Sequence, residues 1–151
     1  MPPKIGFIAK SREVIDFWLL RLPWPNIEPN LISYLALPAS LAFILVWPVN
    51  KLAALIILMV VLILDWLDGL VAKKFGKASE KGWVIDVVTD RLSEGIIFAY
   101  FFHPWFYFFL LNILLTLFSY KFKKFSLILP LRHLFFLYLI LFFSFYYFFT
   151  R

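Results

Sequence analysis

Long apolar runs, separated by short polar stretches, organise this chain. A helix that spans a membrane needs about 20 mostly apolar residues. The runs predict these spans: Leu31–Val49, Lys51–Lys74, Gly82–Phe102, His103–Tyr120 and Ile128–Thr150. A turn is expected at Asn26–Asn30, and Pro130 fits the first turn of the last helix. We therefore expect an all-α integral membrane protein, a bundle of transmembrane helices.

The N-terminal residues have a different pattern, in which charges interrupt every apolar run. Residues 4–22 mix lysine, arginine and acidic residues with aliphatic and aromatic side chains. This mixture favours an amphipathic helix that lies in the membrane interface and ends near Pro23 and Pro25. A charged leader is the alternative. We expect residues 1–25 to be a juxtamembrane segment of one membrane-embedded domain, 1–151.

The composition supports a membrane protein. Of the 151 residues, 64% are hydrophobic and 16% are charged, whereas about 25% of residues in soluble proteins are charged. There is no cysteine, so a metal would have to bind to carboxylates, histidines or backbone oxygens. The net charge of +6 comes mostly from residues at helix ends. We therefore expect a lipid bilayer as the partner and no nucleic acid.

Basic residues concentrate on one side of the predicted bundle. The N-terminal segment, Lys73–Lys81 and Lys121–Arg132 belong to that side, whereas Lys51 and Arg151 belong to the other. Cytoplasmic loops of membrane proteins carry an excess of lysine and arginine. We therefore expect a multi-pass protein of the cell membrane with a cytoplasmic N-terminus.

Four aspartates occur in or beside the apolar runs: Asp65, Asp68, Asp86 and Asp90. An unpaired carboxylate is costly in a bilayer, so such residues point to a functional site. Residues three or four apart share one helix face. The first pair therefore forms one stripe and the second pair another, on helices that a short loop makes antiparallel neighbours. The convergence of four carboxylates near the cytoplasmic face indicates a bound cation.

Small residues accompany both stripes. Gly69, Ala72 and Gly82 keep the gap between the helices open to a ligand. Oxygen ligands without histidine or cysteine favour Mg²⁺, Mn²⁺ or Ca²⁺ over zinc, and bound Mg²⁺ commonly keeps positions for substrate phosphates. Alternative interpretations are structural hydrogen bonding, a cation or proton transporter, and an intramembrane Mg²⁺-dependent prenyltransferase.

The two stripes form one spaced motif. It consists of Asp65-x2-Asp68-Gly69-x2-Ala72-Lys73 and, eight residues later, Gly82-x3-Asp86-x3-Asp90. It resembles the signature of the CDP-alcohol phosphotransferases, integral membrane enzymes of phospholipid synthesis. Every spacing is kept, and Lys73 stands where the signature has arginine. Lysine cannot make the bidentate contact of arginine with phosphate, so diphosphate binding can differ in geometry.

The resemblance implies a reaction. Members of this family transfer a phosphatidyl-type group from a CDP-alcohol, such as CDP-diacylglycerol or CDP-archaeol, to a small polar alcohol and release CMP. It also implies a Mg²⁺ or Mn²⁺ cofactor, six spans per protomer and a homodimer. The five apolar runs of this chain are one fewer than six.

The resemblance also implies roles for the motif residues. Asp65, Asp68 and Asp86 are expected to bind metal, and Asp90 is expected to be the catalytic base and a further metal ligand. The surface that binds CDP is expected to comprise Gly69, Ala72, Lys73 and Gly82.

The acceptor pocket has a weaker signal. Arg132 and Lys121 could hold a phosphorylated acceptor beside the aspartates, or they could anchor the last helices at the cytoplasmic face. Arg91 and Glu94 flank Asp90 and could form pairs across helices or orient Asp90. The sequence leaves the identity of the acceptor and of the lipid backbone open.

Overall fold

The structure is a computed structural model of the whole chain, and it describes residue 21 and residues 26–122 and 129–149. The amphipathic helix expected at residues 4–22, and with it most of the juxtamembrane segment 1–25, lies outside the described residues.

The described part of the chain is all-helical and contains no strand, which confirms the all-α fold. Its helices are α2 (Pro29–Val46), α3 (Lys51–Lys74), α4 (Glu80–Phe101), α5 (Trp105–Phe122) and α6 (Leu131–Phe149). Each of the five predicted runs is thus one helix, and α3 has the predicted bounds.

The other helix ends differ from prediction by a few residues, for local reasons. Helix α2 begins at Pro29, inside the expected turn, because proline suits the first helical position. Helix α4 begins at Glu80 because the Ser79 hydroxyl caps it, accepting a 3.0 Å hydrogen bond from the Gly82 N–H. Pro130 lies directly before α6, and its carbonyl accepts a 3.1 Å hydrogen bond from the Leu134 N–H.

Two helices, α2 and α3, are long and apolar enough to cross a membrane, and α5 and α6 contain shorter apolar stretches. Helix α4 has the length but carries acidic and basic residues along its middle, including Asp86, Asp90, Arg91 and Glu94. The sequence predicts five membrane spans, and among the described helices two, α2 and α3, have the length and composition of a span.

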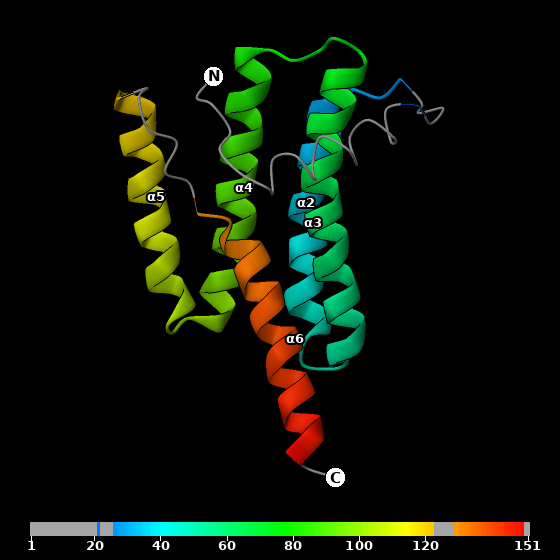
Figure 1. Cartoon of the computed structure of the whole chain (residues 1–151), viewed down its shortest axis with the longest axis vertical. Helices are drawn as coiled ribbons and strands as arrows, with labels where there is room; N and C mark the ends of the chain where they lie inside the picture. Colours follow the sequence, from blue (N-terminus) through cyan, green and yellow to red (C-terminus); the bar gives the residue numbers. More distant parts are fainter. Residues whose placement is uncertain (1–20, 22–25, 123–128, 150–151) are drawn as a thin grey trace.

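The helices form a bundle in which α2 packs most extensively against α3 and α4, while α6 contacts α3 and α5 (Figure 1). The α3–α4 connection lies at one end of the bundle, and the α2–α3 and α4–α5 connections lie at the other (Figure 1). Helix α6 begins about halfway along α4 rather than at an end of the bundle (Figure 1). The first residues of α6 therefore lie beside the middle of α4.

Aromatic side chains fill the core between the start of α6 and the end of the bundle that holds the α2–α3 and α4–α5 connections. Phe43, Phe98 and Phe135 are fully buried and come from α2, α4 and α6. The Phe98 and Phe135 rings meet edge to face with centroids 5.3 Å apart, a favourable aromatic geometry. This packing fixes α6 against α2 and α4, which matters because α6 supplies a side chain to the site.

Candidate active site

Three carboxylates from two helices meet in the interior. Asp65 of α3 and Asp86 and Asp90 of α4 each offer an oxygen, and these oxygens lie within 4.8 Å of one another. We call these three residues the aspartate cluster. The spacing of four residues places Asp86 and Asp90 on one face of α4, and the short connection from α3 places Asp65 opposite them.

Asp68 lies one turn after Asp65 and has a different partner. The Ser33 hydroxyl of α2 donates a 2.6 Å hydrogen bond to Asp68 Oδ2. Both residues are buried. Asp68 is therefore held by α2, adjacent to the aspartate cluster but outside the group whose oxygens converge.

A buried arginine is part of the site. From the first turn of α6, Arg132 Nη2 donates to Asp65 Oδ1 at 2.9 Å and also to Asp90 Oδ1. Its Nη1 donates to the Ser93 hydroxyl at 3.4 Å. Only 4% of the Arg132 side chain is exposed. The guanidinium thus joins α3, α4 and α6 and supplies positive charge to two of the three clustered carboxylates.

A second polar group lies one turn deeper on α4. Arg91 Nη1 and Glu94 Oε2 form a 2.7 Å salt bridge along the helix. Glu94 also accepts a 3.2 Å hydrogen bond from Asn112 Nδ2 of α5. The sequence allowed either pairs across helices or orientation of Asp90. In the structure Arg91 and Glu94 form a salt bridge within α4, and Glu94 also contacts α5 through Asn112.

The aspartate cluster has the properties of a site for a hard divalent cation. Asp86 Oδ1 is buried and has no hydrogen-bond partner among the described residues. A buried carboxylate oxygen without a hydrogen-bond partner is costly, and a cation would satisfy it. Because all the converging ligands are oxygens, Mg²⁺ or Mn²⁺ suits them better than zinc.

The residues expected to bind CDP line the neighbouring end of α3 and the start of α4. Gly69 is exposed, and a Cβ at this position would meet no atom within 4 Å. Lys73 is exposed in the last turn of α3, with Ala72 half-buried beside it. A Cβ at Gly82 would lie 3.6 Å from Asn30 Oδ1. Open space beside Gly69, directly after Asp68, leaves room for a ligand.

The residues expected in the acceptor pocket occupy separate places. Arg132 contacts Asp65 and Asp90, as described above. Lys121 lies exposed in the last turn of α5. The geometry therefore places Arg132 in direct contact with the aspartate cluster.

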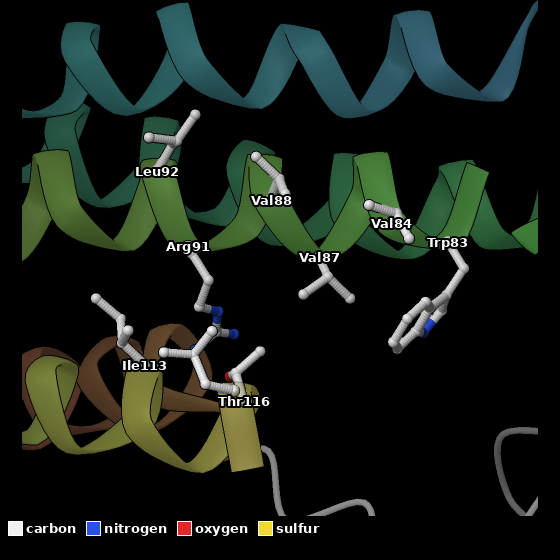
Figure 2. Close-up of a pocket in the computed structure, with 9 residues that line it drawn as sticks. Trp83, Val84, Val87, Val88, Arg91, Leu92, Ile113 and Thr116 are labelled. Atoms are coloured by element: carbon white, nitrogen blue, oxygen red, sulfur yellow. The ribbon is translucent and has the colours of Figure 1, made fainter. Parts of the chain in front are cut away.

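A cavity of about 270 Å³ lies between α4 and α5 (Figure 2). Its lining is almost entirely apolar, with the Arg91 side chain extending from α4 toward α5 (Figure 2). The residues that line it are Trp83, Val84, Val87, Val88, Arg91, Leu92, Ile113, Thr116 and Leu117. None of these is a carboxylate, so the cavity is distinct from the aspartate cluster.

Three polar residues of the site were not singled out from the sequence. They are Ser33, Ser93 and Asn112, which bond Asp68, Arg132 and Glu94 respectively. Asn112 had a usable signal, since it stands alone inside the apolar run from Trp105 to Leu115. Ser33 and Ser93 had no such signal, because serine is common in membrane helices.

Comparison with known proteins gives two findings. A family model described as CDP-alcohol phosphatidyltransferase matches residues 26–146. The CDP-diacylglycerol–inositol 3-phosphatidyltransferase of Candida albicans (strain SC5314 / ATCC MYA-2876) is 35% identical over 72 residues, which are 48% of this chain and 31% of the relative. The match thus spans about a third of the length of that relative. No solved structure matches the chain.

Proposed function

The chain belongs to the CDP-alcohol phosphatidyltransferase family, a membrane-associated family of transferases, and from this premise we propose its reaction. It transfers a phosphatidyl-type group from a CDP-alcohol, such as CDP-diacylglycerol or CDP-archaeol, to an alcohol acceptor. An oxygen–phosphorus bond to the acceptor forms, the bond between phosphorus and the CMP oxygen breaks, and CMP leaves. The family match favours this reaction over prenyl transfer and over cation transport.

The observation that carries the proposal is the aspartate cluster with its partnerless Asp86 oxygen. Asp65, Asp86 and Asp90 would hold Mg²⁺ or Mn²⁺, and Asp68 would complete the set after exchanging its bond with Ser33. A bound divalent cation neutralises diphosphate charge and improves CMP as a leaving group. The chain's part is to hold three carboxylates near one point with Asp68 adjacent to them, and the short α3–α4 connection supports that arrangement.

We assign Asp90 the role of general base. A free alcohol is a weak nucleophile, and a carboxylate within hydrogen-bond reach can accept its proton as the new bond to phosphorus forms. Asp90 is about one-fifth exposed, and Arg132 contacts its Oδ1. That contact orients the carboxylate, leaving Oδ2 for the acceptor hydroxyl. Arg132 is also the better candidate for holding a phosphorylated acceptor, because it already lies beside the base, whereas Lys121 would act only as surface charge.

The CDP surface would comprise Gly69, Ala72, Lys73 and Gly82. The open space at Gly69 supports a nucleotide passing close to α3 at this point. The lysine at position 73 carries a point charge that can follow a phosphate without the fixed geometry of a guanidinium.

Changing Gly69 tests this surface. Gly69→Leu is expected to raise the KM for the CDP-alcohol by about tenfold or more, because its side chain would fill space left for the nucleotide. Thermal unfolding in detergent should change little, since nothing lies within 4 Å of the added Cβ. Ala78→Leu in the exposed α3–α4 connection is the matched control. An unchanged KM for the Gly69 variant would place the nucleotide elsewhere.

We also propose the finer topology, in which all five described helices belong to a multi-pass protein of the cell membrane. Lys73, Lys74, Lys77 and Lys81 lie at the end of the bundle that holds the α3–α4 connection, and Lys51 lies at the other end. The excess of lysine supports a cytoplasmic location for the first end. The active site would then open to the cytoplasm. A homodimer, expected from the family, is tested by the mass of the detergent-solubilised protein in light scattering.

The central experiment measures CMP release. The purified chain in mixed micelles with Mg²⁺ or Mn²⁺ is offered CDP-diacylglycerol or its archaeal ether counterpart, with inositol, inositol phosphate, glycerol phosphate or serine as acceptor. CMP release that requires both metal and one acceptor is expected. Absence of release with every pair would overturn the proposed function. The result also identifies the acceptor, which the site geometry leaves open.

A further inference from the structure

Asn112 is fully buried in the middle of α5, and both the oxygen and the nitrogen of its side-chain amide form hydrogen bonds. Its Oδ1 accepts a 3.0 Å hydrogen bond from the Leu129 N–H, and its Nδ2 donates to the Leu129 carbonyl at 2.9 Å. The same Nδ2 donates to Glu94 Oε2 at 3.2 Å. A side-chain amide has two donor hydrogens and one acceptor oxygen. The three hydrogen bonds of the amide are therefore directed at one backbone residue and one carboxylate.

The place of Leu129 explains why such a partner is needed. Leu129 precedes α6 and belongs to no helix, yet α6 begins about halfway along α4 (Figure 1). Backbone groups at that depth cannot rely on bulk water, so irregular segments need partners from the protein. Asn112 bonds both the N–H and the carbonyl of Leu129, and the same carbonyl also accepts a 2.9 Å hydrogen bond from the Leu131 N–H. Leu129 is thereby fixed to α5.

Fixing Leu129 has a consequence three residues later. Pro130 follows Leu129 and restricts the backbone, and Arg132 is the second residue of α6, after Leu131. The Arg132 guanidinium reaches Asp65 and Asp90 from that position. A displacement of the helix start would move the guanidinium away from both carboxylates. The position of Leu129 therefore determines where the Arg132 guanidinium lies relative to the aspartate cluster.

We propose that Asn112 is a positioning residue: it anchors the start of α6 through Leu129 and so holds Arg132 on Asp65 and Asp90. Glu94 supports it by accepting from Nδ2, and Arg91 balances the Glu94 charge through their 2.7 Å contact. The hydrogen bonds of the Asn112 side chain go to Leu129 and Glu94 and to none of the three residues of the aspartate cluster, so it acts through Arg132. For its effect on catalysis, this inference rests on the proposed function.

A double-mutant cycle separates positioning from general stability. Asn112→Leu is expected to lower kcat/KM about 10- to 100-fold, the range seen for residues that orient a site through another residue. In an Arg132→Gln background the same change should cost less than about threefold, because no guanidinium remains to be positioned. Equal losses in both backgrounds would mean a merely structural role and would overturn the proposal.

Two further variants complete the cycle. Thr116→Val lies one turn along α5 and removes a hydroxyl bonded to the Asn112 backbone carbonyl at 2.7 Å, without touching Leu129. It is expected to leave kcat/KM within about twofold of the wild type. Asn112→Ser removes both amide contacts with Leu129 and leaves a small neutral group beside Glu94, so a loss in the same range as for Asn112→Leu is expected. It replaces Asn112→Leu in the cycle if the latter does not fold.

Hydrogen exchange provides a measurement that needs no activity. In the wild-type chain the Leu129 amide is expected to exchange as slowly as amides inside α5, although it lies outside any helix. Rapid exchange at Leu129 would overturn the anchoring even in an active enzyme. Slow exchange in a chain that never releases CMP would instead leave the anchoring intact and remove the proposed function.

Discussion

Asp90→Asn is expected to reduce CMP release by about 10²- to 10⁴-fold, the usual contribution of a general base. The amide keeps the size of the carboxylate and an oxygen that Arg132 can contact, but it cannot accept the acceptor's proton. The loss should fall on kcat, because the proposed CDP surface consists of other residues. Initial rates of CMP release at saturating donor and acceptor measure it.

The matched control for this variant is Glu80→Gln on the same helix. Glu80 is exposed in the first turn of α4, at a distance from the aspartate cluster. The same change of charge there should leave the rate within about twofold of the wild type. Substantial activity in Asp90→Asn would show that another group accepts the proton, and the assignment of Asp90 would be wrong.

Asp86→Asn is expected to abolish the metal response and to stabilise the metal-free protein. Removing a direct ligand should weaken metal binding by more than about 100-fold, since even residues that merely orient ligands cost 10- to 100-fold. The variant also removes a buried charge whose Oδ1 has no partner. The metal-free variant is therefore expected to be more stable by about 1–3 kcal/mol.

Thermal unfolding with and without Mn²⁺ tests both parts of this prediction. The wild type should gain stability with Mn²⁺ and Asp86→Asn should not, because only binding to the folded state shifts the transition. Glu80→Gln serves again as control and should respond like the wild type. An Mn²⁺ response retained by Asp86→Asn would exclude Asp86 as a ligand.

Regular spacing made part of the site predictable. Asp65 and Asp68 are three apart and Asp86 and Asp90 four apart, so a helix necessarily directs each pair to one face. The short stretch between the two helices makes them antiparallel neighbours. Together these two facts bring Asp65, Asp86 and Asp90 together without knowledge of any other helix. The bounds of α3 were predictable from its apolar run, since capping and composition act locally.

The rest depends on contacts between distant segments. Ser33 and Asp68 are 35 residues apart, and Arg132 and Asp65 are 67 residues apart. No periodicity encodes such pairs, because they follow from how α2 and α6 pack on α3 and α4. The sequence therefore grouped Asp68 with the other aspartates, whereas its Oδ2 contacts Ser33. The place along α4 at which α6 begins could not be predicted either. A run of apolar residues predicts a helix but does not say beside which part of a neighbouring helix it starts.

The arginine contact between α6 and the aspartate cluster bears on how the chain is made. Asp90 of α4 is synthesised 42 residues before Arg132. On insertion scales, an acidic residue at the centre of a membrane helix disfavours insertion by about 2.5–3.5 kcal/mol. Until Arg132 is synthesised, Asp65 and Asp90 lack the cation that contacts them in the folded bundle. We therefore expect the proposed membrane insertion of α4 to be completed only after α6 has been synthesised.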